Sequence, residues 1–116
     1  MVKRKGSYET LKNENMRGGE GIVIMEHLLT PSELYEKGRL FAKITVNPGC
    51  SIGKHIHEGE MECFYIIAGT VEFSDNGETV TLNAGDTALT ISGEGHSVKN
   101  TGDVPVEMMA LILYEK

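Results

Sequence analysis

The chain has 116 residues and a net charge of −6, and its isoelectric point lies near 5.2. A chain of this length is expected to form one domain that buries about two thirds of its unfolded surface, so folding needs no disulfide. The acidic balance argues against nucleic acid as a partner, because phosphates are bound by clustered cations. The run Lys3-Arg4-Lys5 is the basic exception, and we expect it to be a solvated terminus.

Two cysteines, Cys50 and Cys63, are present, and the sequence shows neither an apolar leader nor a long apolar run. Both thiols are expected to be reduced structural residues, since cysteine side chains are usually buried. These features predict a cytoplasmic protein without a membrane span.

Residues 1–21 are polar and interrupted by glycines, which predicts an N-terminal arm and loop ahead of a single folded domain over residues 22–116. Strand patterning begins at residues 22–29 and stops at Pro31. Residues 32–37 are predicted to form a short turn of helix at most. Apolar and polar residues then alternate from 39 to 46, which predicts a half-buried strand.

Short strands follow closely in the second half of the chain. Residues 61–73 are predicted to form a long strand broken at Gly69, and Asp75-Asn76-Gly77 is a strong hairpin signal before a returning strand. The predicted strands that follow cover residues 78–82, 87–91, 97–100 and 104–114. So many short strands without an amphipathic helix predict an all-β barrel or sandwich.

Two histidines stand two residues apart at His55 and His57, and a carboxylate, Glu62, follows five residues after the second. In an extended strand, residues two apart project from the same face, so both imidazoles can reach one ion. Glu62 would return on the next strand. His96 lies thirty-four residues beyond Glu62, so only the fold can bring it alongside. Three imidazoles and one carboxylate form a complete side-chain set for a divalent transition metal.

The spacing G-x5-H-x-H-x4-E-x6-G begins at Gly49, and G-x7-G-x2-H-x3-N begins at Gly85. These patterns resemble the two signature motifs of the cupin superfamily, and the chain looks like small single-domain bacterial cupins related to manganese-binding, oxalate-decarboxylase-like proteins. The resemblance implies a cupin double-stranded β-helix, which is an antiparallel jelly-roll barrel. It also implies a metal bound at the mouth of the barrel by His55, His57, Glu62 and His96. Ile91 stands where the second motif usually carries proline, which loosens a turn and removes no ligand.

A divalent ion held by neutral imidazoles and one ionised glutamate has a local charge of about +1, which attracts anions. Four protein ligands on a six-coordinate Mn²⁺ or Fe²⁺ would leave two positions for water, a dicarboxylate, an enediolate or dioxygen. Zn²⁺, Ni²⁺ and Cu²⁺ accept the same ligand types. Mixed nitrogen and oxygen ligation, together with the resemblance, favours Mn²⁺ or Fe²⁺.

Other polar residues near the motifs have structural interpretations. Glu58 and Glu60 compete with Glu62 as carboxylates, but the motif spacing selects Glu62, and the other two are expected in a solvated turn. His27 is expected to be a packing or interface residue rather than a fifth ligand, and Glu94 is expected in a surface turn.

An apolar wall is expected around the site, because Phe64 and Ile66 share the inward face of Glu62, and Gly53 shares that of the two histidines. Such a wall excludes water and strengthens the field of a metal on a bound anion. Further wall candidates, for which core packing is the favoured role, are Met25, Tyr35, Phe41, Met108 and Met109.

Two classes of function fit these features. The leading hypothesis is a metal-dependent enzyme of lyase, isomerase or oxygenase type that acts on a small anionic metabolite, either a carboxylate or a sugar-like molecule. The alternative is a non-catalytic carboxylate-binding or sensor module, because one fold and one metal site host many activities. No residue beyond the ligands is compelled to act as a general acid. A homodimer is expected, since exposed edge strands are commonly covered by another subunit.

Overall fold

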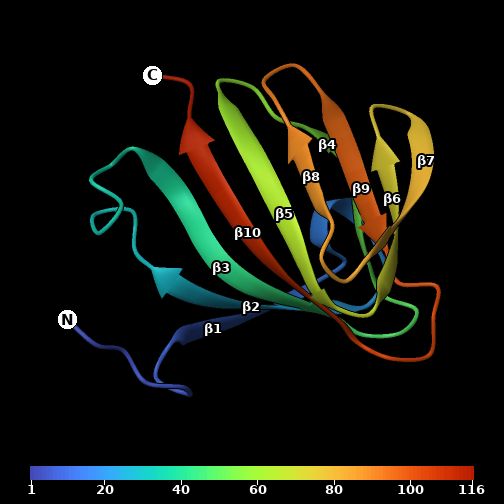
Figure 1. Cartoon of the computed structure of the whole chain (residues 1–116), viewed down its shortest axis with the longest axis horizontal. Helices are drawn as coiled ribbons and strands as arrows, with labels where there is room; N and C mark the ends of the chain where they lie inside the picture. The colour runs from blue at the N-terminus through green and yellow to red at the C-terminus, as the bar shows by residue number, and fades with distance from the viewer.

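Antiparallel strands build two sheets in the computed structural model, which describes residues 1–116 (Figure 1). The first sheet contains, in spatial order, β1 (Glu9–Glu14), β2 (Ile22–Leu29), β3 (Gly38–Val46), β10 (Val106–Tyr114), β5 (Glu60–Ala68) and β8 (Thr87–Thr90). The second contains β4 (Ser51–Ile56), β9 (Gly95–Lys99), β6 (Thr70–Asp75) and β7 (Glu78–Asn83). A 3₁₀ turn, η1 (Met16–Gly18), is the one helical element. The predicted all-β, antiparallel jelly-roll barrel is confirmed.

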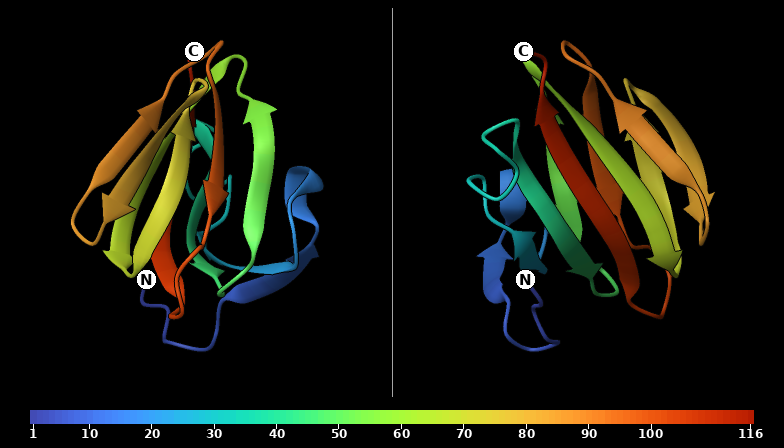
Figure 2. Two further views of the ribbon diagram at one scale, coloured as in Figure 1. Left: turned by 90° about the vertical axis from the view of Figure 1, so that its right-hand side faces the viewer. Right: turned by 60° about the vertical axis from the view of Figure 1, so that its left-hand side comes forward.

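The core lies between the two sheets, which face each other in both views of Figure 2. Alternation along β3 produces this arrangement, because its even-numbered residues from Leu40 to Val46 are buried while the residues between them are partly exposed. The sixteen apolar core residues are Val23, Met25, Leu40, Ala42, Ile44, Val46, Ile52, Phe64, Ile66, Val71, Phe73, Val98, Val106, Met108, Ala110 and Ile112.

The hairpin between β6 and β7 turns at the predicted residues. Asn76 and Gly77 both have positive φ, at 51° and 93°, and Asp75 pairs directly with Glu78. Two consecutive positive φ values define the tight turn that matches the twist of the flanking strands, and Asn-Gly is the pair that adopts it most readily. Local sequence therefore sets the register of this hairpin.

Strand pairing brings the two motifs together. His55 on β4 lies opposite His96 on β9, and Glu62 on β5 lies opposite Thr90 on β8. The β4–β9 pair belongs to one sheet and the β5–β8 pair to the other, so the site forms where the two sheets approach each other.

The N-terminal segment contains a strand where the sequence analysis expected only an arm and a loop. Every residue of β1 pairs with β2, from Glu9 opposite His27 to Glu14 opposite Ile22. The sequence of β1, ETLKNE, is polar and largely exposed, so it lacks the apolar alternation from which strands are predicted.

The turn η1 then packs closely against β4. A Cβ atom added to Gly53 would lie 2.0 Å from the carbonyl oxygen of Arg17, and one added to Gly19 would lie 2.3 Å from that of Ser51. Glycine at both positions permits this backbone approach, which positions Met16 and Arg17 over the barrel.

The connection between β2 and β3 consists of turns rather than a helical segment. Tyr35 and Glu36 both adopt positive φ there, and the Tyr35 side chain is 84% exposed, so Tyr35 takes no part in a pocket wall or core. No helix in the structure has the length and apolar character that crossing a membrane would require.

Candidate metal centre

Four side chains from the two motifs converge inside the barrel, with their potential ligand atoms all within 4.8 Å of one another. The Nε2 atom of His96 lies 3.1 Å from the Nε2 atoms of His55 and His57. The Oε1 atom of Glu62 lies 2.9 Å from Nε2 of His57 and 3.1 Å from Nε2 of His96. The structure thus brings together the four residues to which the sequence analysis assigned metal binding.

Three of the four side chains are almost fully buried. His57, Glu62 and His96 are 3%, 5% and 0% exposed, whereas His55 is partly exposed. The ring of Phe64 stacks on that of His96 with the two centroids 5.1 Å apart. Buried polar groups are costly unless they have partners, so this cluster requires a compensating network.

Each histidine is oriented through its other ring nitrogen. The neighbours of the Nδ1 atoms, each at 2.8 Å, are Gly53 O for His55, Glu60 Oε1 for His57 and Thr90 Oγ1 for His96. The Gly53 carbonyl and the Glu60 carboxylate can only accept, so they hold a proton on Nδ1 of His55 and His57. A proton on Nδ1 leaves the lone pair of Nε2 facing the cluster, which is the arrangement that metal-binding histidines need.

Glu60 corrects the sequence analysis, which expected it in a solvated turn. It is the first residue of β5, and besides His57 it receives two hydrogen bonds from Arg39, at 2.7 and 2.8 Å. Glu60 therefore links an arginine to a candidate metal ligand. Glu58 does lie at an exposed position, as expected.

Hydrogen bonds and burial shift the pKa values of these groups. The hydrogen bonds from Arg39, helped by that from His57, lower the pKa of Glu60 to about 2. Burial acts to raise the pKa of Glu62, but the imidazoles of His57 and His96, which donate a hydrogen bond to it when they are protonated, outweigh burial and the net pKa is lowered. The bond to Glu62 raises the pKa of His57, whereas burial lowers that of His55. Both carboxylates are therefore ionised at neutral pH.

The spacing of the ligand atoms fits a metal ion. A cation about 2.1 Å from each atom separates neighbouring ligands by about 3.0 Å at right angles and by about 3.4 Å at the tetrahedral angle. The closest pairs in the cluster lie 2.9 to 3.1 Å apart. Three neutral imidazoles and a carboxylate are ligand types that divalent transition metals accept, and these four side chains would hold such an ion.

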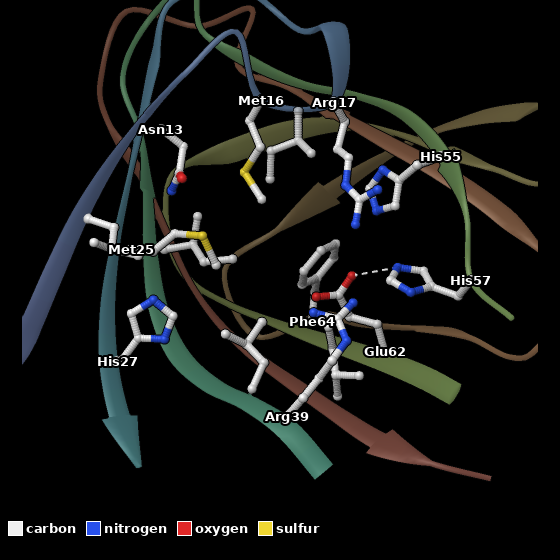
Figure 3. A pocket seen from close by; sticks show the side chains of 15 residues that line it. Asn13, Met16, Arg17, Met25, His27, Arg39, His55, His57, Glu62 and Phe64 are labelled. Carbon is white, nitrogen blue, oxygen red and sulfur yellow. Dashed lines mark ion pairs between the residues drawn. The ribbon is translucent and has the colours of Figure 1, made fainter. Parts of the chain in front are cut away.

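A cavity of about 210 Å³ opens beside the cluster (Figure 3). Glu62, His55 and His57 line one end, and Asn13 and His27 line the opposite end. The apolar wall between them includes Leu11, Met16, Met25, Leu40, Ile44, Ile52, Phe64 and Ile112. The volume lies below the usual range for drug-sized ligands, so the cavity suits a small metabolite.

Two arginines also line the cavity. Arg17 reaches into it from η1, and its positive charge is close enough to His55 to lower the pKa of that imidazole slightly, after burial. Arg39 lies on β3, and the salt bridge to Glu60 balances its charge. Arg17 takes part in no salt bridge, so its charge is available to an anion entering the cavity. The sequence analysis missed Arg17, because a single arginine in a glycine-rich loop carries no distinctive pattern.

The remaining predicted wall residues divide among the cavity, the core and the outer face of the first sheet, where Phe41 and Met109 are partly exposed and belong to neither wall nor core. Met25 and Phe64 line the cavity, whereas Ile66 and Met108 are fully buried in the core. His27 lies outside the group of four ligands but inside the cavity wall. Glu94 accepts a hydrogen bond from the backbone of Ile91, as a turn residue does.

A model described as the cupin domain matches residues 42–112 of this sequence, more than half of the chain. The chain belongs to the cupin family. The matched segment contains all four residues of the cluster, in agreement with the motif resemblance.

Similarity to proteins of Thermotoga maritima extends over nearly all of the chain. The oxalate-binding protein of Thermotoga maritima is 46% identical over 113 residues, which are 97% of this chain and 93% of that protein. A crystal structure described as a predicted oxalate decarboxylase from Thermotoga maritima superposes with a TM-score of 0.94, covering 98% of this chain and 99% of the other at 46% identity. The tetracenomycin polyketide synthase protein TcmJ of Streptomyces glaucescens is 30% identical over 71% of this chain and 55% of its own length. This cupin therefore resembles small cupins of the oxalate-decarboxylase-like kind.

Glu60→Gln is expected to weaken divalent metal binding by about 10- to 100-fold, because it disturbs the group that orients the His57 ring. Titration of the purified protein with Mn²⁺, followed by calorimetry, measures the change. Glu58→Gln, two residues away and exposed, is the matched control and should leave the affinity unaltered. Equal losses of metal affinity in the two variants would show that Glu60 affects binding only through its negative charge and not by orienting the His57 ring.

Proposed function

We propose that this cupin holds one divalent metal ion through His55, His57, Glu62 and His96 and uses it to bind a small carboxylate such as oxalate. The observation that carries the proposal is the convergence of these four ligand atoms beside a cavity that also receives Arg17. The similarity to the oxalate-binding protein of Thermotoga maritima supports the choice of anion.

Mn²⁺ and Fe²⁺ are the ions that we favour. The ligand set of three imidazoles and one carboxylate, with no thiolate, supports this choice, because thiolates favour softer ions. Four protein ligands would leave two positions of a six-coordinate ion for the oxygens of a carboxylate ligand. When bound, the metal would supply Lewis acidity at these oxygens.

The protein's own charges support binding of an anion at this end of the cavity. Arg17 presents a guanidinium without a carboxylate partner, and guanidinium groups bind carboxylates through paired hydrogen bonds. Arg17 lines the cavity but is itself exposed, so water screens part of this attraction. Arg39 contributes less, since Glu60 already neutralises it.

Metal-dependent catalysis is the second candidate, and one observation favours it. His27 places an imidazole outside the ligand set in the wall of the same cavity, and imidazole is the side chain most often used for proton transfer. The only carboxylate in the cavity wall is Glu62, which is committed to the cluster. Binding without turnover is therefore the function that the geometry supports best.

Purified protein that has not met a chelator is expected to contain about one divalent metal per chain, which elemental analysis measures. His57→Ala should lower this content strongly, because it removes a ligand. Chelation should also lower the melting temperature, since only the folded chain assembles the four ligands. Full metal content in the variant lacking all four side chains would contradict the assignment.

Oxalate is expected to bind to the metal-loaded protein and to bind far more weakly after chelation, as measured by calorimetry with parallel detection of products. Arg17→Gln should weaken oxalate binding about tenfold, because a hydrogen bond between charged groups contributes about 1.5–3 kcal/mol. Arg4→Gln removes the same charge from the exposed N-terminus and should have no effect. Equal affinity in the loaded and chelated forms would refute metal-dependent binding, and product formation would favour the enzyme.

We also propose that two copies pair through the outer face of the first sheet. Tyr65, Ile67 and Leu89 are 47%, 42% and 55% exposed there, and the partly exposed Met109 lies opposite Tyr65 on β10. These residues form a continuous apolar surface across β10, β5 and β8, and such surfaces mark sites of protein association.

Sedimentation at micromolar concentration is expected to show a dimer, and the double substitution of Tyr65 and Leu89 by lysine should convert it to a monomer, because charges in an apolar interface are costly. Val80→Lys changes a similarly exposed apolar residue on β7 of the other sheet and should leave the dimer intact. A monomeric parent protein would refute the proposal.

A further inference from the structure

The end of the cavity that faces away from the metal centre carries two unsatisfied polar atoms. Nδ2 of Asn13 and Nε2 of His27 are buried and find no hydrogen-bond partner among the protein's own atoms. Both side chains line the cavity of the candidate metal centre, from β1 and β2 respectively (Figure 3). A buried polar atom without a partner costs about 1–3 kcal/mol, so both atoms are suited to a group that enters the cavity.

The two atoms are not placed to bind the same group. Asn13 lies opposite Val23 in the β1–β2 ladder, and His27 is four residues further along β2. Four residues of a strand span about 13 Å, so the polar positions are spread along the far wall. Between them the wall is apolar and contains Leu11 and Met25.

The chemistry of this wall selects hydroxyl groups over a second charge. A hydroxyl both donates and accepts, so it can satisfy the amide of Asn13 and either tautomer of His27. A second carboxylate would lie among Leu11, Met16 and Met25, away from both arginines, at a large desolvation cost. Both arginines of the cavity lie toward the metal end (Figure 3).

We infer that the ligand of this cupin is a polyhydroxylated carboxylate, longer than oxalate, whose hydroxyl groups hydrogen-bond to Asn13 and His27. This inference rests on the proposed function, because the metal centre and Arg17 hold the carboxylate of the ligand. Oxalate consists of two carboxylates joined directly, so it occupies only the metal end. The volume of about 210 Å³ accommodates the longer molecule. Asn13 and His27 are thus specificity-determining residues of the cavity.

Calorimetry on Mn²⁺-loaded protein with gluconate and 2-hydroxyhexanoate tests the inference. The two acids share their length, carboxylate and adjacent hydroxyl, and differ only in the hydroxyls along the tail. Gluconate is expected to bind about tenfold more tightly. Asn13→Leu and His27→Phe should each reduce that preference several-fold, while the affinity for oxalate changes less than twofold. His27→Gln keeps a hydrogen-bonding end and should retain part of the preference.

The inference would be overturned if the parent protein did not prefer gluconate, or if both apolar variants kept the preference. Neither outcome would contradict oxalate binding. Oxalate and gluconate binding that is equally strong after chelation would instead refute the proposed function, and absence of binding by every acid would refute both.

The melting temperatures of the two apolar variants should equal or exceed that of the parent, because neither polar atom has a partner in the protein. A large fall in melting temperature would assign both residues a structural role and contradict their role in specificity.

Discussion

The hydrogen bonds at the three Nδ1 atoms are the constraint on which the candidate metal centre depends. Without them each imidazole could rotate or exchange its tautomer, and three Nε2 lone pairs would not face one point. The protein supplies a different partner each time, from the backbone, a carboxylate and a hydroxyl group. These partners lie on β4, β5 and β8, so the orientation of the ligands is a property of the barrel as a whole.

The network around Glu60 joins the metal centre to the charge distribution of the cavity. Arg39 holds the carboxylate, and the carboxylate holds the ring of His57. An ionised partner makes the imidazole a stronger ligand, and it leaves Arg39 largely neutralised. Arg17, by contrast, keeps its charge for whatever enters the cavity. The two arginines of the cavity therefore differ in their partners, because Glu60 forms a salt bridge with Arg39 and none with Arg17.

The N-terminal segment supplies part of the cavity wall beside the candidate metal centre. The four candidate ligands all come from β4 to β9, but Leu11, Asn13, Met16 and Arg17 come from β1 and η1. The close approach of η1 to Gly53 fixes these side chains beside the centre without any motif of their own. Such a division would let a common metal site serve different ligands, because these wall residues lie outside the family motifs.

The sequence by itself determined the features that are encoded locally. The apolar run at residues 22–29 placed β2, the two-residue period placed β3, Asn76-Gly77 set the turn of a hairpin, and the two motifs identified the four residues of the cluster. Tertiary structure alone decided the rest. The polar strand β1 forms because β2 offers an open edge, and nothing in its own sequence alternates. Glu58 and Glu60 are chemically identical, and only the position of Arg39, twenty-one residues away from Glu60, distinguishes them. Arg17, Asn13 and His27 likewise line one cavity with His55, His57 and Glu62, which are distant from them in the chain, and local patterns carry no information about such an arrangement.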